Sequence, residues 1–192
     1  MKFDGKAFAK KIEDQVAARS LTIDSKPKIV SILVGNDPAS VLYTGLKHKA
    51  AERVGIDFEV VRLESITKEQ VKAITLREDV TGLMIQLPVP DLQGPTLQGV
   101  LSAIPYDKDV DGLGYPESGV VPPVVSAILR VMDEIALNSK LKITNSKIVV
   151  VGAAGFVGSG VMAELSKRGI LAHGVERGDD MGIIKTGDIV IS

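Results

Sequence analysis

A tyrosine and a lysine, Tyr43 and Lys47, are spaced so that they could carry out chemistry together. Their segment begins with Asp37 and Pro38, which are typical of a helix start because the carboxylate accepts backbone N–H bonds and proline fits the first turn. Residues separated by one helical turn share a face, so we expect the phenol and the amine side by side. A lysine beside buried surface can lose its charge and transfer protons. A half-buried tyrosine next to a solvated lysine is the alternative interpretation.

The elements that would position this pair are visible as alternating apolar patterns. The helix itself is expected to dock on a core through an apolar stripe formed by Leu42, Leu46, Ala50 and Val54. Strand-like β-branched runs alternate with helical periodicity along the chain, which favours an α/β fold with a mostly parallel sheet. We predict strands at residues 28–34, 58–63, 82–87, 147–151, 170–175 and 188–191, and helices at 8–18, 37–55, 67–76, 92–104, 123–135 and 156–168.

The composition restricts the class of protein. The 192 residues suffice for one large or two small domains, and the net charge of −1 gives no electrostatic reason to bind nucleic acid or a membrane surface. The absence of cysteine excludes disulfides and thiolate metal sites, and the 2 histidines are not clustered, so no metal is expected. With no signal peptide or membrane span in the sequence, we expect a cytoplasmic protein.

A glycine-rich loop follows the strand predicted at residues 147–151. A strand, a glycine loop and a helix in this order are the context that a dinucleotide-binding site requires. The glycines allow a tight turn and a close approach to pyrophosphate, while the helix N-terminus supplies free N–H groups. The spacing differs from G-x-G-x-x-G, so a purely structural turn is the alternative. The predicted cofactor-binding residues of the loop are Gly152, Ala153, Ala154, Gly155 and Gly158.

Two charged residues at the end of the next strand bear on the choice of cofactor. Glu176 can accept a hydrogen bond from the ribose 2′-hydroxyl of NAD, whereas Arg177 could pair with the 2′-phosphate of NADP. Asp179 and Asp180 add negative charge nearby and disfavour that phosphate. The sequence therefore leans toward NAD and leaves NADP open, with a solvated charged loop as the alternative.

Three segments of the first part of the chain combine into a family signature. They are VGNDPAS at residues 34–40, followed by Tyr43 and Lys47; GLMIQLPVP at 82–90; and KDVDG at 108–112. Together they closely resemble the bifunctional methylenetetrahydrofolate dehydrogenase/methenyltetrahydrofolate cyclohydrolase family. The resemblance covers nearly the whole chain, and the glycine loop lies where the family has its cofactor loop.

The resemblance implies two domains. Residues 1–120 would form a three-layer α/β folate-binding catalytic domain, residues 121–139 a connecting helix, and residues 140–192 a Rossmann-type NAD(P)-binding domain. Family members continue well beyond the position of Ser192, so we expect a fragment or a short form in which the Rossmann-type domain is truncated and the nicotinamide site is incomplete. The full-length form would be a homodimer.

The resemblance also assigns roles in a reaction on a tetrahydrofolate-borne carbon. The dehydrogenase step would move a hydride from 5,10-methylene-tetrahydrofolate to NADP or NAD, and the cyclohydrolase step would open the resulting methenyl ring with water. Lys47 matches the family's proton-transferring lysine, and Gln86 matches the residue that hydrogen-bonds and tunes it. Tyr43 matches the aromatic residue that packs on the folate, and Asp111 matches the carboxylate that holds the pterin. Ser40 lies where the family has a supporting polar residue.

Two other interpretations fit parts of the sequence. A non-catalytic relative could have kept the fold and bind folate or a dinucleotide without turnover. A different two-domain NAD(P)-dependent dehydrogenase would share the arrangement of domains, but it gives no role to Gln86 or to residues 108–112. The loop also departs from the resembled family, whose members commonly carry arginine or serine where this chain has Ala153 and Ala154.

Overall fold

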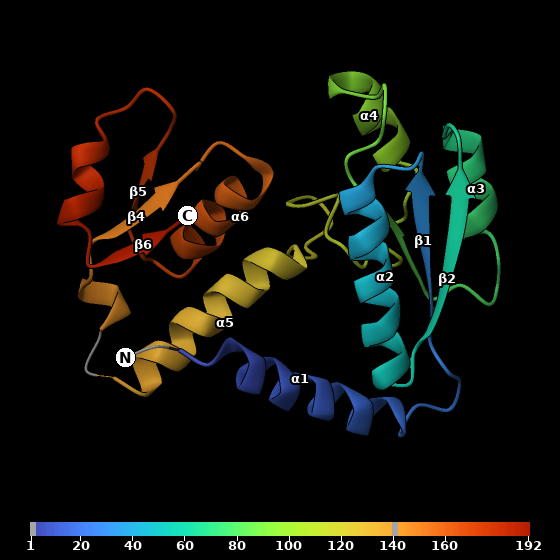
Figure 1. The fold of residues 1–192 in the computed structure, drawn as a ribbon, viewed down its shortest axis with the longest axis horizontal. Coiled ribbons are helices and arrows are strands. Elements are labelled where there is room, and N and C mark those ends of the chain that lie inside the picture. The colour runs from blue at the N-terminus through green and yellow to red at the C-terminus, as the bar shows by residue number, and fades with distance from the viewer. Residues whose placement is uncertain (1–2, 140–141) are drawn as a thin grey trace. The chain divides into compact units, whose positions relative to one another are not determined.

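The structure, a computed structural model, describes residues 3–139 and 142–192, and it separates into two compact units that divide between Val120 and Val121 (Figure 1). Each unit contains its own parallel sheet with helices packed on it. The α/β class predicted from the sequence is thus confirmed. The predicted start of the cofactor domain, residue 140, lies outside the described residues, and the functional domain boundaries stay predictions.

The first unit is built on a three-stranded parallel sheet in the order β2-β1-β3. Its central strand β1 is almost entirely apolar and buried, as expected for a parallel strand that is covered on both faces. Helices α3 and α4 contribute to the main apolar core on one face, and α2 packs on β1 and β2. The elements are α1 (Gly5–Ser20), β1 (Lys28–Val34), α2 (Pro38–Arg53), β2 (Asp57–Leu63), α3 (Lys68–Thr75), β3 (Gly82–Ile85) and α4 (Gly94–Leu101).

The face by which α2 docks differs from the prediction. Its buried residues are Ser40, Thr44 and Ala51. Leu42 and Leu46, which the sequence analysis placed on the core, are 61% and 51% exposed, so that prediction was wrong. Small side chains let the helix backbone approach the sheet closely, which favours the serine and threonine face despite its polarity. The two leucines are left on the outward side of the helix.

The second unit repeats the same plan with a second parallel sheet, in the order β5-β4-β6. Helices α5 and α6 pack against each other at Gly160, where a Cβ atom would lie only 2.8 Å from Val125 Cγ2. The short helix η2 was not among the predicted elements. The elements are α5 (Pro123–Leu137), η1 (Ile143–Asn145), β4 (Ile148–Val151), α6 (Phe156–Lys167), β5 (Ala172–Val175), η2 (Met181–Thr186) and β6 (Ile189–Ile191).

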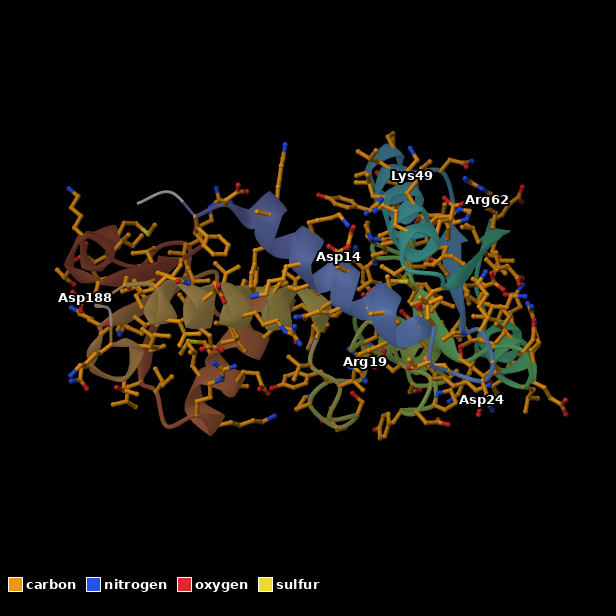
Figure 2. All side chains as sticks on the ribbon, turned by 90° about the horizontal axis from the view of Figure 1, so that it is seen from below. Asp14, Arg19, Asp24, Lys49, Arg62 and Asp188 are labelled. Atoms are coloured by element: carbon orange, nitrogen blue, oxygen red, sulfur yellow. The ribbon has the colours of Figure 1, made fainter. Side chains whose placement is uncertain are left out.

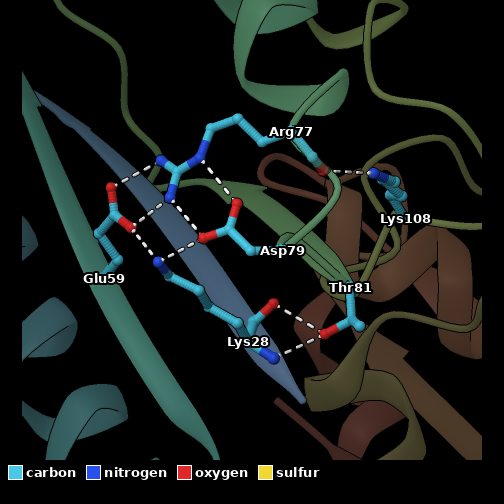
Figure 3. A network of polar contacts seen from close by, with 6 residues as sticks. All are labelled: Lys28, Glu59, Arg77, Asp79, Thr81 and Lys108. Carbon is cyan, nitrogen blue, oxygen red and sulfur yellow. Dashed lines mark hydrogen bonds and ion pairs between the residues drawn. The ribbon is translucent and has the colours of Figure 1, made fainter. Parts of the chain in front are cut away.

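Charged side chains cover the surfaces of both units, and the labelled Asp14, Lys49 and Asp188 in Figure 2 are all exposed. One group of charges is instead organised across the first sheet (Figure 3). Arg77 donates to both carboxylate oxygens of Glu59 at 2.8 Å, and Lys28 pairs with Glu59 at 2.8 Å and with Asp79 at 2.7 Å. Hydrogen bonds from Arg77 and Lys28 lower the pKa of Glu59 from 4.5 to about 2.

In the part of the chain that the structure describes, none of the helices has the length and apolar character that crossing a membrane requires.

Candidate functional site

The first unit brings together two predicted site residues that are far apart in the sequence. Lys47 Nζ lies 3.3 Å from Asp111 Oδ2, and the two side chains are 35% and 23% exposed. Lys47 reaches this position from the docked helix α2, whereas Asp111 follows a segment that runs beside β3. The pair combines an amine and a carboxylate that both remain accessible to a ligand.

Tyr43 stands one turn before Lys47 on α2 and is 58% exposed. Leu42 and Leu46 are exposed on the same helix. An exposed aromatic ring can pack on a flat heterocycle and bury area in both groups. The structure therefore places Tyr43 where it could form one wall of a site around Lys47.

Gln86 follows the last residue of β3 and is 9% exposed. Its Nε2 donates to the carbonyl oxygen of Leu87 at 2.8 Å, which fixes the orientation of the amide. The Oε1 atom is buried and has no hydrogen-bond partner within residues 3–139 and 142–192. Within the described residues Lys47 pairs with Asp111, whereas the hydrogen bond of Gln86 goes to Leu87, so the predicted contact between Gln86 and Lys47 stays a prediction.

Other unpaired polar atoms are buried in the same unit. Ser40 and Thr44 are 2% exposed and lie on the sheet-facing side of α2, and Ser31 is fully buried in β1. Among the described residues, the hydroxyl oxygens of Thr44 and Ser31 also lack hydrogen-bond partners, whereas the Ser40 hydroxyl, after the Ser40 backbone N–H, helps to lower the pKa of the nearby Asp37 carboxyl group. Buried polar groups are usually paired, so these open hydrogen-bonding positions are exceptions within the unit. Sequence reasoning named Ser40 but missed Thr44 and Ser31, because a lone hydroxyl within an apolar run carries no motif.

A further residue was missed in the segment that ends in Asp111. The carboxylate of Asp109 is buried and accepts hydrogen bonds from three backbone N–H groups, those of Asp111, Leu113 and Gly114. An aspartate followed closely by glycines is a common loop-forming pattern, and that signal could have identified it. Asp109 therefore belongs to the structure that carries Asp111.

The second unit contains the predicted glycine loop between β4 and α6. Gly152 has φ +73°, a conformation that strongly favours glycine. A Cβ atom on Gly158 would lie 2.1 Å from the carbonyl oxygen of Gly152, so only glycine fits the first turn of α6. The helix begins after Gly155, and this N-cap residue provides no side-chain cap. The first amides of α6 thus have no capping side chain, as in anion-binding helix starts.

Glu176, which follows β5, contacts this loop. Its Oε1 accepts a hydrogen bond from the backbone N–H of Ala154, and its own backbone N–H donates to Asp179 Oδ2 at 2.7 Å. The structure thus brings the predicted ribose-binding acid to the glycine loop. Arg177 is exposed, and no bond from its side chain to the loop is among the recorded contacts of residues 142–192.

The side chains of the described residues also bear on whether the protein has a metal centre. Within residues 3–139 and 142–192, no group of three or more histidine, aspartate or glutamate side chains is arranged to hold a metal ion.

Comparisons with known proteins agree with both units. The sequence profile described as tetrahydrofolate dehydrogenase/cyclohydrolase, catalytic domain, matches residues 3–111. The bifunctional protein FolD of Methanosarcina barkeri is 34% identical over 182 residues, and the match covers 86% of this chain and 61% of that protein. Bifunctional protein FolD 2 of Desulfitobacterium hafniense is 30% identical over 209 residues, covering 98% of this chain and 71% of that one.

A solved structure shows the same fold. The crystal structure of the bifunctional FolD methylenetetrahydrofolate dehydrogenase/cyclohydrolase from Campylobacter jejuni superposes with a TM-score of 0.82 at 26% identity. That match covers 97% of this chain and 71% of the Campylobacter chain. The profile match contains Lys47, Gln86 and Asp111, which the sequence analysis predicted as site residues. On these grounds the chain belongs to the tetrahydrofolate dehydrogenase/cyclohydrolase family.

Proposed function

We propose that the protein oxidises 5,10-methylene-tetrahydrofolate with a nicotinamide cofactor and hydrolyses the methenyl product to 10-formyl-tetrahydrofolate. The observation that carries this proposal is the accessible Lys47–Asp111 pair beside Tyr43, within the residues that match the family's catalytic domain. The chain spans 61% of the Methanosarcina relative, so the activity of the whole relative does not transfer by similarity alone.

The site residues suit the two steps. Asp111 would accept hydrogen bonds from the pterin N–H groups, and the ring of Tyr43 would pack on the folate. When bound, the nicotinamide would supply the hydride acceptor, and loss of a hydride with its electron pair from the methylene carbon would leave a methenyl cation. Water would then add to that carbon with Lys47 taking one of its protons as general base. The ring C–N bond would break as the departing nitrogen takes up the remaining hydroxyl proton. Gln86 would orient the lysine through its free Oε1, and Ser40 would support the start of α2.

The ion pair suggests how substrate binding and proton transfer are linked. In the structure Asp111 is the partner of Lys47, at 3.3 Å. A pterin that takes the carboxylate for its own N–H groups would leave the amine without that partner. The positively charged methenyl product would further disfavour an ammonium group beside it. Lys47 would therefore become a base when the folate is in place.

The glycine loop of the second unit fits the pyrophosphate of a dinucleotide, because its glycines leave backbone amides open at the start of α6. Glu176 already contacts this loop, so a ribose hydroxyl could hydrogen-bond to its carboxylate, while a 2′-phosphate would meet negative charge. We therefore propose NAD as the preferred cofactor over NADP, because Glu176 is the charged residue that already contacts the loop. The cofactor-binding residues would be Gly152, Ala153, Ala154, Gly155, Gly158, Glu176 and Arg177.

The decisive experiment supplies 5,10-methylene-tetrahydrofolate with NAD and with NADP separately and follows formation and decay of the methenyl absorbance. Added methenyl-tetrahydrofolate measures the hydrolysis independently of the cofactor. Decay of the methenyl compound supports the hydrolase assignment, and its formation supports the dehydrogenase. Folate binding without either reaction would instead indicate a non-catalytic binding protein.

The Glu176→Gln variant tests the cofactor preference. It removes the negative charge and keeps a hydrogen-bonding side chain, so the ratio of NADP affinity to NAD affinity should rise about 10-fold. An unchanged ratio would show that Glu176 does not select the cofactor.

We also propose that the folate domain comprises residues 1–120, with residues 121–139 as the connecting helix and residues 140–192 in the cofactor domain. A cytoplasmic location and a homodimeric assembly complete the proposal. Light scattering on the purified protein would measure the oligomeric state.

A further inference from the structure

The segment that carries Asp111 runs along the edge of the first sheet as a fourth, strand-like element. The backbone N–H of Leu83 donates to Lys108 O at 2.7 Å, and Val110 N–H donates to Leu83 O at 3.4 Å. Leu83 and Asp109 form a parallel bridge. The close approach depends on Gly82, where a Cβ atom would lie 2.4 Å from Val110 Cγ1.

The start of this segment is tied to the end of α3. Lys108 Nζ donates to the carbonyl oxygen of Thr75 at 2.7 Å and to that of Arg77 at 3.4 Å, and Figure 3 shows the second of these bonds. Cations near a helix C-terminus satisfy its free carbonyls and the negative end of its dipole. Lys108 therefore holds the beginning of the segment, before Asp111, against the end of α3.

Asp109 organises the part of the chain that follows it. Its carboxylate is 5% exposed, and a carboxylate is rarely buried unless hydrogen bonds compensate for the lost water. Oδ1 accepts from the N–H groups of Asp111 at 3.2 Å and Leu113 at 3.1 Å, and Oδ2 accepts from Gly114 at 2.9 Å. The chain that follows Asp109 is thus folded around its side chain.

We propose that Asp109 is a positioning residue for the folate site, acting through Asp111. Its carboxylate holds the backbone of Asp111 so that the Asp111 side chain meets Lys47. The inference rests on the proposed function. It adds to the same site a residue that positions Asp111, the proposed partner of the pterin. Small displacements of a binding group cost much of its contribution to a reaction.

The test compares Asp109→Asn with Asp107→Asn, the same change at an exposed position two residues earlier. An amide keeps one acceptor oxygen but places an NH₂ group against one of the backbone donors, so part of the loop is released. For Asp109→Asn we expect KM for the folate substrate to rise about 10- to 100-fold, with a smaller fall in kcat. Asp107→Asn should behave like the unchanged protein. Equal KM values for the Asp109 variant and the unchanged protein would overturn the inference.

A double-mutant cycle separates positioning from general destabilisation. If Asp109 acts through Asp111, adding Asp109→Asn to the Asp111→Asn variant should change KM less than 2-fold. A factor of about 2 is the scatter within which independent effects usually add, so a smaller change counts as no further effect. Independent, multiplying effects of the two changes would show that Asp109 only supports the fold and would contradict the proposal.

Hydrogen exchange of the unchanged protein tests the loop without any variant or substrate. The backbone amides of Asp111, Leu113 and Gly114 should exchange far more slowly than those of exposed loops, because each donates to a buried carboxylate. Exchange at unprotected rates would overturn the inference even if folate turns over. Protected amides in a protein that neither binds nor converts folate would instead place the failure with the proposed function.

Discussion

The chain makes the same turn after β1 and after β4, the central strands of the two sheets. Gly35 and Gly152 follow these strands with φ +71° and +73°. Their N–H groups donate to the last residues of the neighbouring strands, Leu63 O at 2.9 Å and Val175 O at 2.8 Å. In both sheets the next strand lies on one side of the central strand and the third on the other. Such reversal points are where ligands bind in open parallel sheets.

The helices that follow the two turns begin differently. At the start of α2 the carboxylate of Asp37 accepts from Ser40 N–H at 2.8 Å, and this backbone hydrogen bond lowers the pKa of Asp37. At the start of α6 the N-cap is Gly155, which has no side chain to bond the helix amides. The first helix start therefore repels an anion, and α2 contributes Lys47 from further along the helix, whereas the start of α6 offers backbone amides. The two helices thus follow the same kind of turn but differ at the N-cap, which is Asp37 in α2 and Gly155 in α6.

The replacement Lys47→Met should have the largest effect on this comparison. It removes the proposed base from α2, so methenyl-tetrahydrofolate hydrolysis should fall about 10²- to 10⁴-fold while dinucleotide affinity is unchanged. Hydrolysis is measured by decay of the methenyl absorbance and dinucleotide binding by calorimetry. Lys49→Met, on the same helix but exposed, is the control. A hydrolysis rate unaffected by the loss of Lys47 would refute its assignment.

The replacement Gly158→Ala should produce the reverse pattern. Its Cβ would lie 2.1 Å from Gly152 O, and overpacking of this kind costs about 1–3 kcal/mol. If that cost falls on the bound state, the dinucleotide should bind about 5- to 150-fold more weakly. Hydrolysis by the first unit should persist. Gly99→Ala in α4, where a Cβ meets nothing within 4 Å, is the matched control. Dinucleotide affinity equal to that of the control would mean that the loop does not hold the cofactor.

Charge contributes to the stability of the first sheet through Glu59, and Glu59→Gln tests this contribution. The pKa of Glu59 is lowered from 4.5 to about 2, so its contribution to stability is present above pH 4.5 and is lost as the pH falls toward 2. Because Glu59 is a third exposed, we expect the variant to lose about 1–2 kcal/mol of unfolding free energy at pH 7 and little at pH 2. Urea unfolding at both pH values measures this, with Glu64→Gln as the control. A difference that persists at pH 2 would contradict the electrostatic explanation.

The smallest expected effect is that of Asp37→Ala. It removes the side-chain cap of α2, which should lower Tm by about 2–5 °C. The pKa of Asp37 is lowered in the fold, so this difference should shrink as the pH falls below 3.8. Asp24→Ala, in an exposed turn, serves as the comparison in thermal melts. If both variants melt alike, the cap does not distinguish the two turns energetically.

Much of the fold was predictable because its signals are local. The strand expected at residues 28–34 is β1 with the same bounds, and the helix expected after Asp37 is α2 with that residue as its N-cap. The family resemblance is confirmed, whereas the individual roles of Lys47, Gln86 and Glu176 stay predictions. The outward position of Leu42 and Leu46 was not predictable from periodicity, because several faces of α2 carry apolar residues.

The sequence by itself determined the glycine turns, the helix starts and the apolar strands, because each depends on a residue and its near neighbours in the chain. Only the tertiary structure decided that Lys47 meets Asp111 and that Ser40 and Thr44 face the sheet. It also decided that the buried Asp109 carboxylate holds the backbone of Asp111. These contacts join segments separated by strand pairing and helix docking, and they depend on register and close packing that no local pattern specifies.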